Sequence, residues 1–61
     1  MTPRIRLMIK LCKAGRMTRK ELMNSLVDPD LNLLIELCTS FNLFIEGEPN
    51  EEKCLALLLD E

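Results

Sequence analysis

Apolar residues recur every three or four positions between residues 3 and 14, which is the spacing of one face of an α-helix. The apolar positions of this face are Ile5, Met8, Ile9 and Cys12. Pro3 suits the first turn of such a helix, and Gly15 suits the position at which it stops. The pattern therefore predicts a first helix over residues 3–14, with these four side chains facing a core.

A short second helix is predicted to begin at Thr18. Thr18 and Glu21 have the spacing of a capping box, in which each side chain accepts a hydrogen bond from the other residue's backbone N–H. The inner face of this helix is expected to consist of Leu22, Leu26 and either Met23 or Val27. The helix is expected to end before Asp28.

A longer apolar stripe predicts a third helix, which follows a short acidic turn. The stripe consists of Leu31, Leu34, Ile35, Cys38 and Phe41. Before it, Asp28 can cap the helix, Pro29 fits the first turn, and Asp30 suits the positive end of the helix dipole. Asn42 can adopt the left-handed backbone that ends a helix. The side chains expected to face outward are Asn32, Glu36, Thr39 and Ser40.

The last part of the chain has two interpretations. Residues 43–45 predict a short strand, and Gly47, Pro49 and Asn50 predict a turn after it. The composition of residues 51–59 favours a helix capped by Asn50. Its inward positions would be Cys54, Leu55, Leu58 and Leu59. The same stretch would also suit the second strand of a hairpin, and periodicity does not decide between the two.

The order of these elements resembles that of the winged helix-turn-helix superfamily. Residues 18–45, TRKELMNSLVDPDLNLLIELCTSFNLFI, look like the family's short second helix, turn, recognition helix and entry into the wing. The resemblance implies a mainly α fold, with a three-helix helix-turn-helix core followed by a short strand and either a wing-like hairpin or a C-terminal helix. Because the chain is long enough for one domain, we expect a single winged-helix-like domain over residues 1–61.

In DNA-binding members of that superfamily, the third helix enters the major groove. The resemblance would place Asn32, Glu36, Thr39 and Ser40 there, and none of these residues is cationic. The acids of the expected wing are Glu46, Glu48, Glu51 and Glu52. Because duplex DNA carries about one negative charge per 1.7 Å, this surface would repel it. Nucleic-acid binding is therefore disfavoured at the third helix and the wing.

Cationic and acidic residues occupy different parts of the sequence. Seven of the eight cations lie within the first twenty positions and every acid follows them, although the net charge is only −2. These cations are Arg4, Arg6, Lys10, Lys13, Arg16, Arg19 and Lys20. The split has three interpretations: two solvated faces, complementarity with a protein partner or between head-to-tail copies, or a phosphate-binding patch on the first helix and the link after it.

The residue types argue against several classes of function. The chain has no histidine and its cysteines, Cys12, Cys38 and Cys54, are far apart, so a zinc site and acid–base catalysis lack their usual residues. We expect no catalytic, metal or cofactor site, and we expect buried free thiols in a cytoplasmic, reducing compartment. The longest apolar run, residues 54–59, is far shorter than the roughly 20 residues that span a bilayer, so no membrane contact is expected.

The two aromatic residues, Phe41 and Phe44, are expected in the core, where neither could stack on a nucleotide base. The apolar fraction of 48% is generous, because so short a chain buries only about 60% of its unfolded surface. We therefore expect a homodimer or a docked complex.

The expected function is that of a small non-enzymatic regulatory or adaptor module acting through protein–protein contacts. Its partner-binding surfaces would be the basic face formed by the seven cations and the outer face of the third helix. The alternative is a small DNA-binding winged helix-turn-helix transcriptional regulator that uses the basic N-terminal region.

Overall fold

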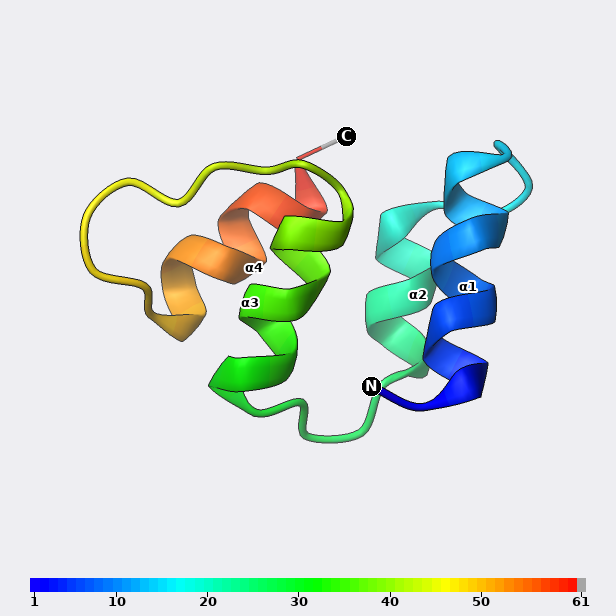
Figure 1. Cartoon of the computed structure of the whole chain (residues 1–61), viewed down its shortest axis with the longest axis horizontal. Helices are drawn as coiled ribbons and strands as arrows, with labels where there is room; N and C mark the ends of the chain where they lie inside the picture. Colours follow the sequence, from blue (N-terminus) through cyan, green and yellow to red (C-terminus); the bar gives the residue numbers. More distant parts are fainter. Residues whose placement is uncertain (61) are drawn as a thin grey trace.

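The computed structural model describes residues 1–60, and its described part contains four helices. The helices are α1 (Pro3–Lys13), α2 (Arg19–Ser25), α3 (Leu31–Ser40) and α4 (Glu51–Leu59). α1 and α2 lie side by side as a hairpin, and α3 and α4 form the other half of the molecule (Figure 1). Because α4 packs against both α2 and α3, the last helix joins the two halves.

A side chain caps the start of every one of these helices. The caps are Thr2, Thr18, Asp30 and Asn50, and each accepts a hydrogen bond of 2.8–3.2 Å from the backbone N–H three residues later. The capping box at Thr18 is confirmed, since its backbone N–H donates to Glu21 Oε1 at 3.3 Å. The predicted cap at Asp28 is wrong. Asp28 instead has a φ of +44° and turns the chain before Asp30 caps α3.

Two helices end in the same way, at residues with a left-handed backbone. Gly15 follows α1 with a φ of +75°, and Asn42 follows α3 with a φ of +58°. After α3, Leu43 N–H donates to Cys38 O at 2.8 Å and Asn42 N–H donates to Thr39 O at 3.1 Å. This is the Schellman pattern, so the predicted helix stops at Gly15 and Asn42 are confirmed.

The predicted fold class is wrong, because the described residues are all-helical outside their turns and loops. Residues 1–60 contain no strand, and no wing-like hairpin forms after α3. Residues 51–59 form α4, which leaves residues 43–45 without a strand to pair with, and an isolated strand cannot satisfy its backbone groups. Residues 41–50 form an irregular loop that arches away from α3 (Figure 1).

The core is apolar and draws on all four helices. Its buried members are Met8, Ile9, Leu22, Leu34, Leu37, Cys38, Cys54 and Leu58. Leu37, which the predicted stripe omits, is fully buried because α4 covers a second side of α3. Two expectations of burial are wrong: Phe44 is 79% exposed and Leu59 is 49% exposed. Phe44 lies in a connecting loop, and Leu59 is the last residue of α4. Of the two alternatives for the inner face of α2, Met23 packs against the core and Val27 is 89% exposed.

Candidate protein-binding groove

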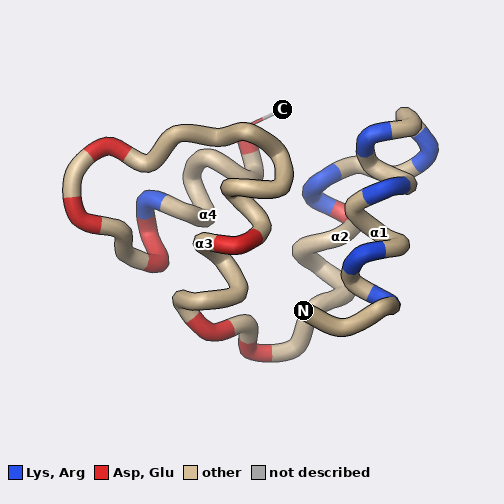
Figure 2. The backbone as a smooth tube through the Cα atoms, in the orientation of Figure 1, with Lys and Arg blue, Asp and Glu red and all other residues tan. Residues whose placement is uncertain are grey.

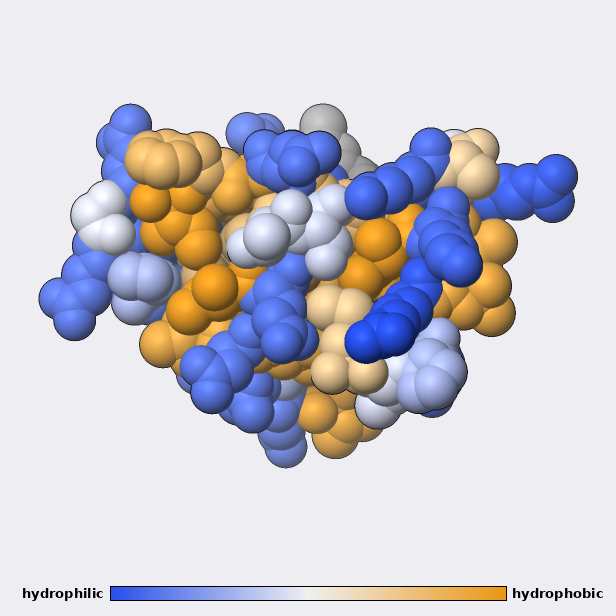
Figure 3. All heavy atoms as spheres, viewed as in Figure 1, coloured by the Kyte–Doolittle hydropathy of each residue, from blue (hydrophilic) through white to orange (hydrophobic). Residues whose placement is uncertain are grey.

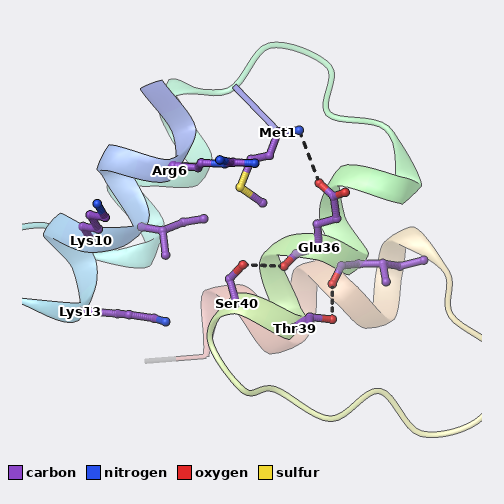
Figure 4. A pocket seen from close by; sticks show the side chains of 9 residues that line it. Met1, Arg6, Lys10, Lys13, Glu36, Thr39 and Ser40 are labelled. Carbon is purple, nitrogen blue, oxygen red and sulfur yellow. Dashed lines mark hydrogen bonds and ion pairs between the residues drawn. The ribbon is translucent and has the colours of Figure 1, made fainter. Parts of the chain in front are cut away.

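A groove of about 590 Å³ lies between α1 and α3 (Figure 4). Its lining residues are Met1, Arg6, Ile9, Lys10, Lys13, Ile35, Glu36, Thr39 and Ser40. Two surfaces that the sequence suggests separately therefore meet in one place. The central part of the basic face supplies one wall of this α1–α3 groove, and the outward residues of α3 supply the other.

The wall on α1 is cationic. Arg6, Lys10 and Lys13 occupy positions i, i+4 and i+7, so they lie along one side of the helix, and all three are exposed. Arg6 and Lys13 extend toward α3 (Figure 4). Lys10 and Lys13 also stand in the last turn of α1, where a positive charge interacts favourably with the helix dipole. A cationic wall in this position is compatible with a stable helix.

The wall on α3 carries hydroxyl groups and one carboxylate. Thr39 Oγ1 donates to Ile35 O at 3.0 Å, and Ser40 Oγ donates to Glu36 O at 2.9 Å (Figure 4). Because the hydroxyl protons are used within the helix, the oxygen lone pairs remain able to accept hydrogen bonds from a ligand. Glu36 Oε2 lies 3.9 Å from the α-amino group of Met1, a long and partly exposed pair of small energetic weight.

The floor of the groove is apolar. Ile9 is 7% exposed and belongs to the core, and Ile35 is partly buried against that core. Figure 3 shows hydrophobic atoms between hydrophilic ones on this side of the molecule. An apolar floor beside charged walls is the arrangement that binds an amphipathic segment, because the floor takes apolar side chains while the walls fix polar ones.

Arg19, a predicted binding residue, is instead engaged with the end of α4. Its Nη1 donates to Leu57 O at 3.4 Å, and its Nη2 donates to Asp60 O. These carbonyl oxygens belong to the C-terminal end of α4, where a cation satisfies acceptors that the helix leaves unpaired. Arg19 therefore ties α2 to α4.

The remaining predicted residues lie outside the groove. Arg4, Arg16 and Lys20 are exposed. Asn32 lines a separate depression of about 330 Å³ beside Asp30 and Leu33. The structure thus brings together six of the eleven predicted side chains: Arg6, Lys10, Lys13, Glu36, Thr39 and Ser40.

Sequence reasoning did not identify the floor of the groove. The sequence predicts that Ile9 and Ile35 face the core. Each lies at the edge of its apolar stripe, four residues before a residue of the groove wall: Ile9 precedes Lys13, and Ile35 precedes Thr39. This spacing indicates a boundary between apolar and polar surface on each helix. It does not show that the two boundaries face one another, which depends on how α1 and α3 pack.

An acidic segment, residues 44–52, lies away from the groove. Its four glutamates are exposed, and they are Glu46, Glu48, Glu51 and Glu52. The nearby Lys53 donates through Nζ to Glu46 O and Glu48 O, at 3.0 Å each, so its ammonium group bonds backbone carbonyls of the segment. Cations gather over α1 and the start of α2, whereas most acids lie on the loop, on α4, on α3 and in the turn before α3 (Figure 2).

The thiols of Cys38 and Cys54 are fully buried where α3 meets α4, and Cys12 is half-buried. Burial raises the pKa of the Cys38 thiol to about 11 from an ordinary 9.0, and the charge and hydrogen bonding of Cys54 add to this shift. Cys38 is therefore protonated at neutral pH, and the thiolate needed for nucleophilic attack does not form. Within residues 1–60, no three potential metal-binding side chains of His, Cys, Asp or Glu form a cluster.

No known protein family matches this chain, and neither a curated protein nor a solved structure does so. Of the helices in residues 1–60, none has the length and apolar character needed to cross a membrane. The α1–α3 groove and the distribution of charge are the features of the chain that bear on its function.

Proposed function

We propose that this chain is a small non-enzymatic regulatory or adaptor module that binds a protein segment in the α1–α3 groove. One observation carries the proposal: three cations of α1 stand beside an apolar floor within a single groove. The groove has a volume of about 590 Å³ and is open to solvent, as the docking of a chain segment requires. The proposed role involves no catalysis: the hydroxyl groups of Thr39 and Ser40, the nucleophiles of the groove, donate to carbonyl oxygens of α3 rather than to a base.

The partner segment would combine apolar and acidic side chains. Its apolar side chains would cover Ile9 and Ile35, and its carboxylates would lie beside Lys10 and Lys13. Burial of the apolar side chains would supply most of the affinity. The charges would speed the encounter and select against cationic segments. A short amphipathic helix or an extended segment with this composition fits the groove.

Duplex DNA is the second candidate partner, and the exposed cations of α1 favour it. Such binding would use phosphate contacts from Lys10, Lys13 and neighbouring cations, without sequence readout. The position of α3 argues against insertion of that helix into a DNA groove, because Thr39 and Ser40 line the α1–α3 groove, whose other wall is α1.

The substitution Thr39→Arg separates the two candidates. A long side chain at this position obstructs the groove and adds a positive charge, and arginine is a good helix former. Capture of a partner protein from the source cells should therefore fall at least tenfold. Weak binding to duplex DNA, measured by fluorescence anisotropy at low salt, should instead become stronger.

Two lysine substitutions form a matched pair, a test inside the groove and a control outside it. Lys10→Glu reverses a charge within the groove and should reduce capture of the same partner, whereas Lys20→Glu makes the same change outside the groove and should not. The purified partner should then shift the NMR signals of Ile9 and Ile35. A partner that is captured equally by all variants would contradict the proposal, and so would DNA binding with a steep salt dependence that Lys10→Glu reduces.

A further inference from the structure

The acidic segment, residues 44–52, has the chemistry that the α1–α3 groove is proposed to accept. It begins at Phe44, whose aromatic side chain is 79% exposed. Its four glutamates follow within eight residues and are all exposed. An exposed aromatic side chain followed by carboxylates is the complement of an apolar floor beside cations. The chain thus carries both a groove and a segment whose chemistry is complementary to that groove.

The carboxylates of the segment are available to another molecule. Within residues 1–60 they form no ion pair. Lys53 is the cation nearest to them in sequence, and its Nζ bonds the carbonyl oxygens of Glu46 and Glu48. These two bonds hold the backbone of the segment in one conformation, which lowers the entropy that binding would cost. The negative charge itself is left unpaired.

The segment does not reach the groove of its own chain. The acidic loop and the start of α4 lie at one end of the molecule, while the cations of α1 lie at the other (Figure 2). The longest dimension of the molecule is 31 Å. A contact between the segment and the groove must therefore form between two copies.

We propose that the acidic segment of one copy docks into the α1–α3 groove of a second copy. The inference rests on the proposed function, because it uses the same groove. Phe44 would cover Ile9 and Ile35, and the glutamates would lie beside Lys10 and Lys13. Because segment and groove are different surfaces, a pair of copies keeps one groove and one segment unused, and the association is head-to-tail. Self-association then competes with binding of the partner protein.

Two charge reversals on the full-length chain test this geometry. Lys10→Glu damages the groove and leaves the segment intact, whereas Glu48→Lys damages the segment and leaves the groove intact. Sedimentation velocity at low salt, between roughly 10 μM and 1 mM protein, should show concentration-dependent association of the wild type. Each variant alone should associate at least tenfold more weakly. An equimolar mixture should associate more strongly than either variant alone, since the intact segment of Lys10→Glu can dock into the intact groove of Glu48→Lys.

Lys20→Glu is the control, because it changes the same charge outside the groove and should associate as the wild type does. Circular dichroism establishes that every variant keeps its helices. A wild type that remains monomeric over this range overturns the inference, and so does a mixture of folded variants that remains monomeric. If partner capture still depends on the groove in that case, only self-association is refuted. If capture does not depend on the groove, the proposed function fails as well.

Discussion

Cys38 and Cys54 show how burial controls a titratable side chain in this molecule. Both thiols are inaccessible to solvent, and Cys38 Sγ donates a weak hydrogen bond to Cys54 O at 3.8 Å. The surroundings are apolar, so a negative charge on Cys38 Sγ would lose its hydration. The pKa of Cys38 rises to about 11 for this reason. The thiol thus packs as a small hydrophobic group.

Thiolate formation should be measurable without interference, because the chain has no tyrosine or tryptophan to absorb near 240 nm. In a pH titration followed at this wavelength, we expect a step near pH 11 from Cys38. Cys38→Ala should remove that step and Cys12→Ala should not. A folded protein that forms all of its thiolates near pH 9 would contradict the assignment.

The same shift predicts how stability depends on pH. The unfolded chain releases the Cys38 proton near pH 9 and the folded chain releases it near pH 11, so the folded state holds more protons between these values. The contribution of this thiol is complete below pH 9 and is lost as the pH rises toward 11, at about 1.4 kcal/mol for each unit of pKa difference. In urea denaturation, the unfolding free energy of Cys38→Ala should therefore decline less between pH 9 and pH 11 than that of the wild type.

Short-range signals in the sequence were the most accurate at the residue scale. Thr18 with Glu21, Gly15 and Asn42 all behave as predicted, because each acts through backbone groups within a few residues of itself. The cap at Asp28 was misassigned because two aspartates flank Pro29 and both suit the position. Only the backbone conformation distinguishes them, and it places Asp30 at the start of α3.

At the scale of elements, α4 shows what local pattern leaves undetermined. Cys54 and Leu58 are buried, and both would share a face either in a helix or in a strand. Ala56 distinguishes the two structures, since it would join that face in a strand and is exposed on α4. The sequence leaves a wing-like hairpin open as an alternative to the helix, because a strand at residues 43–45 could pair with this stretch. Contacts of α4 with α2 and α3, distant in sequence, decide the outcome.

Substitutions in α4 test this assignment directly. Leu58→Ala removes a fully buried side chain and should cost about 2–5 kcal/mol of unfolding free energy, which is a large part of the stability of so small a domain. Ala56→Glu should change the unfolding free energy by less than about 0.5 kcal/mol, because the position is exposed. Urea denaturation followed by circular dichroism measures both. A larger loss for Ala56→Glu than for Leu58→Ala would favour the strand.

The positions of the predicted site residues belong to the element scale as well. The spacing of Arg6, Lys10 and Lys13 identifies a side of α1, and Thr39 and Ser40 identify a side of α3, from helical periodicity alone. That these sides face each other could not be predicted, since the sequence contains no measure of how two helices cross. Arg19 illustrates the same limit, because its acceptors at the end of α4 lie 38 and 41 residues later.

At the scale of the whole molecule, the separation of charge follows from the order of the helices. The first twenty residues contain seven cations and no acid, and they form α1, the turn after it and the start of α2. The acids of residues 44–52 lie at the far end of the loop and on α4 (Figure 2). When two copies approach head to tail, the acidic end of one meets the basic end of the other, so these charges attract. The net charge of −2 adds little repulsion between the copies.

Self-association and thermal stability should therefore be linked. Because the α1–α3 groove exists only in the folded chain, association stabilises the folded state by mass action, and the midpoint of unfolding should rise with protein concentration. Tenfold more protein above the dissociation constant contributes about 1.4 kcal/mol, and in a domain of this size each kcal/mol raises Tm by roughly 4–8 °C. Lys10→Glu and high salt should both remove the concentration dependence in thermal scans by circular dichroism. A wild-type Tm that stays constant over two decades of concentration would show that the copies fold and remain independent of one another.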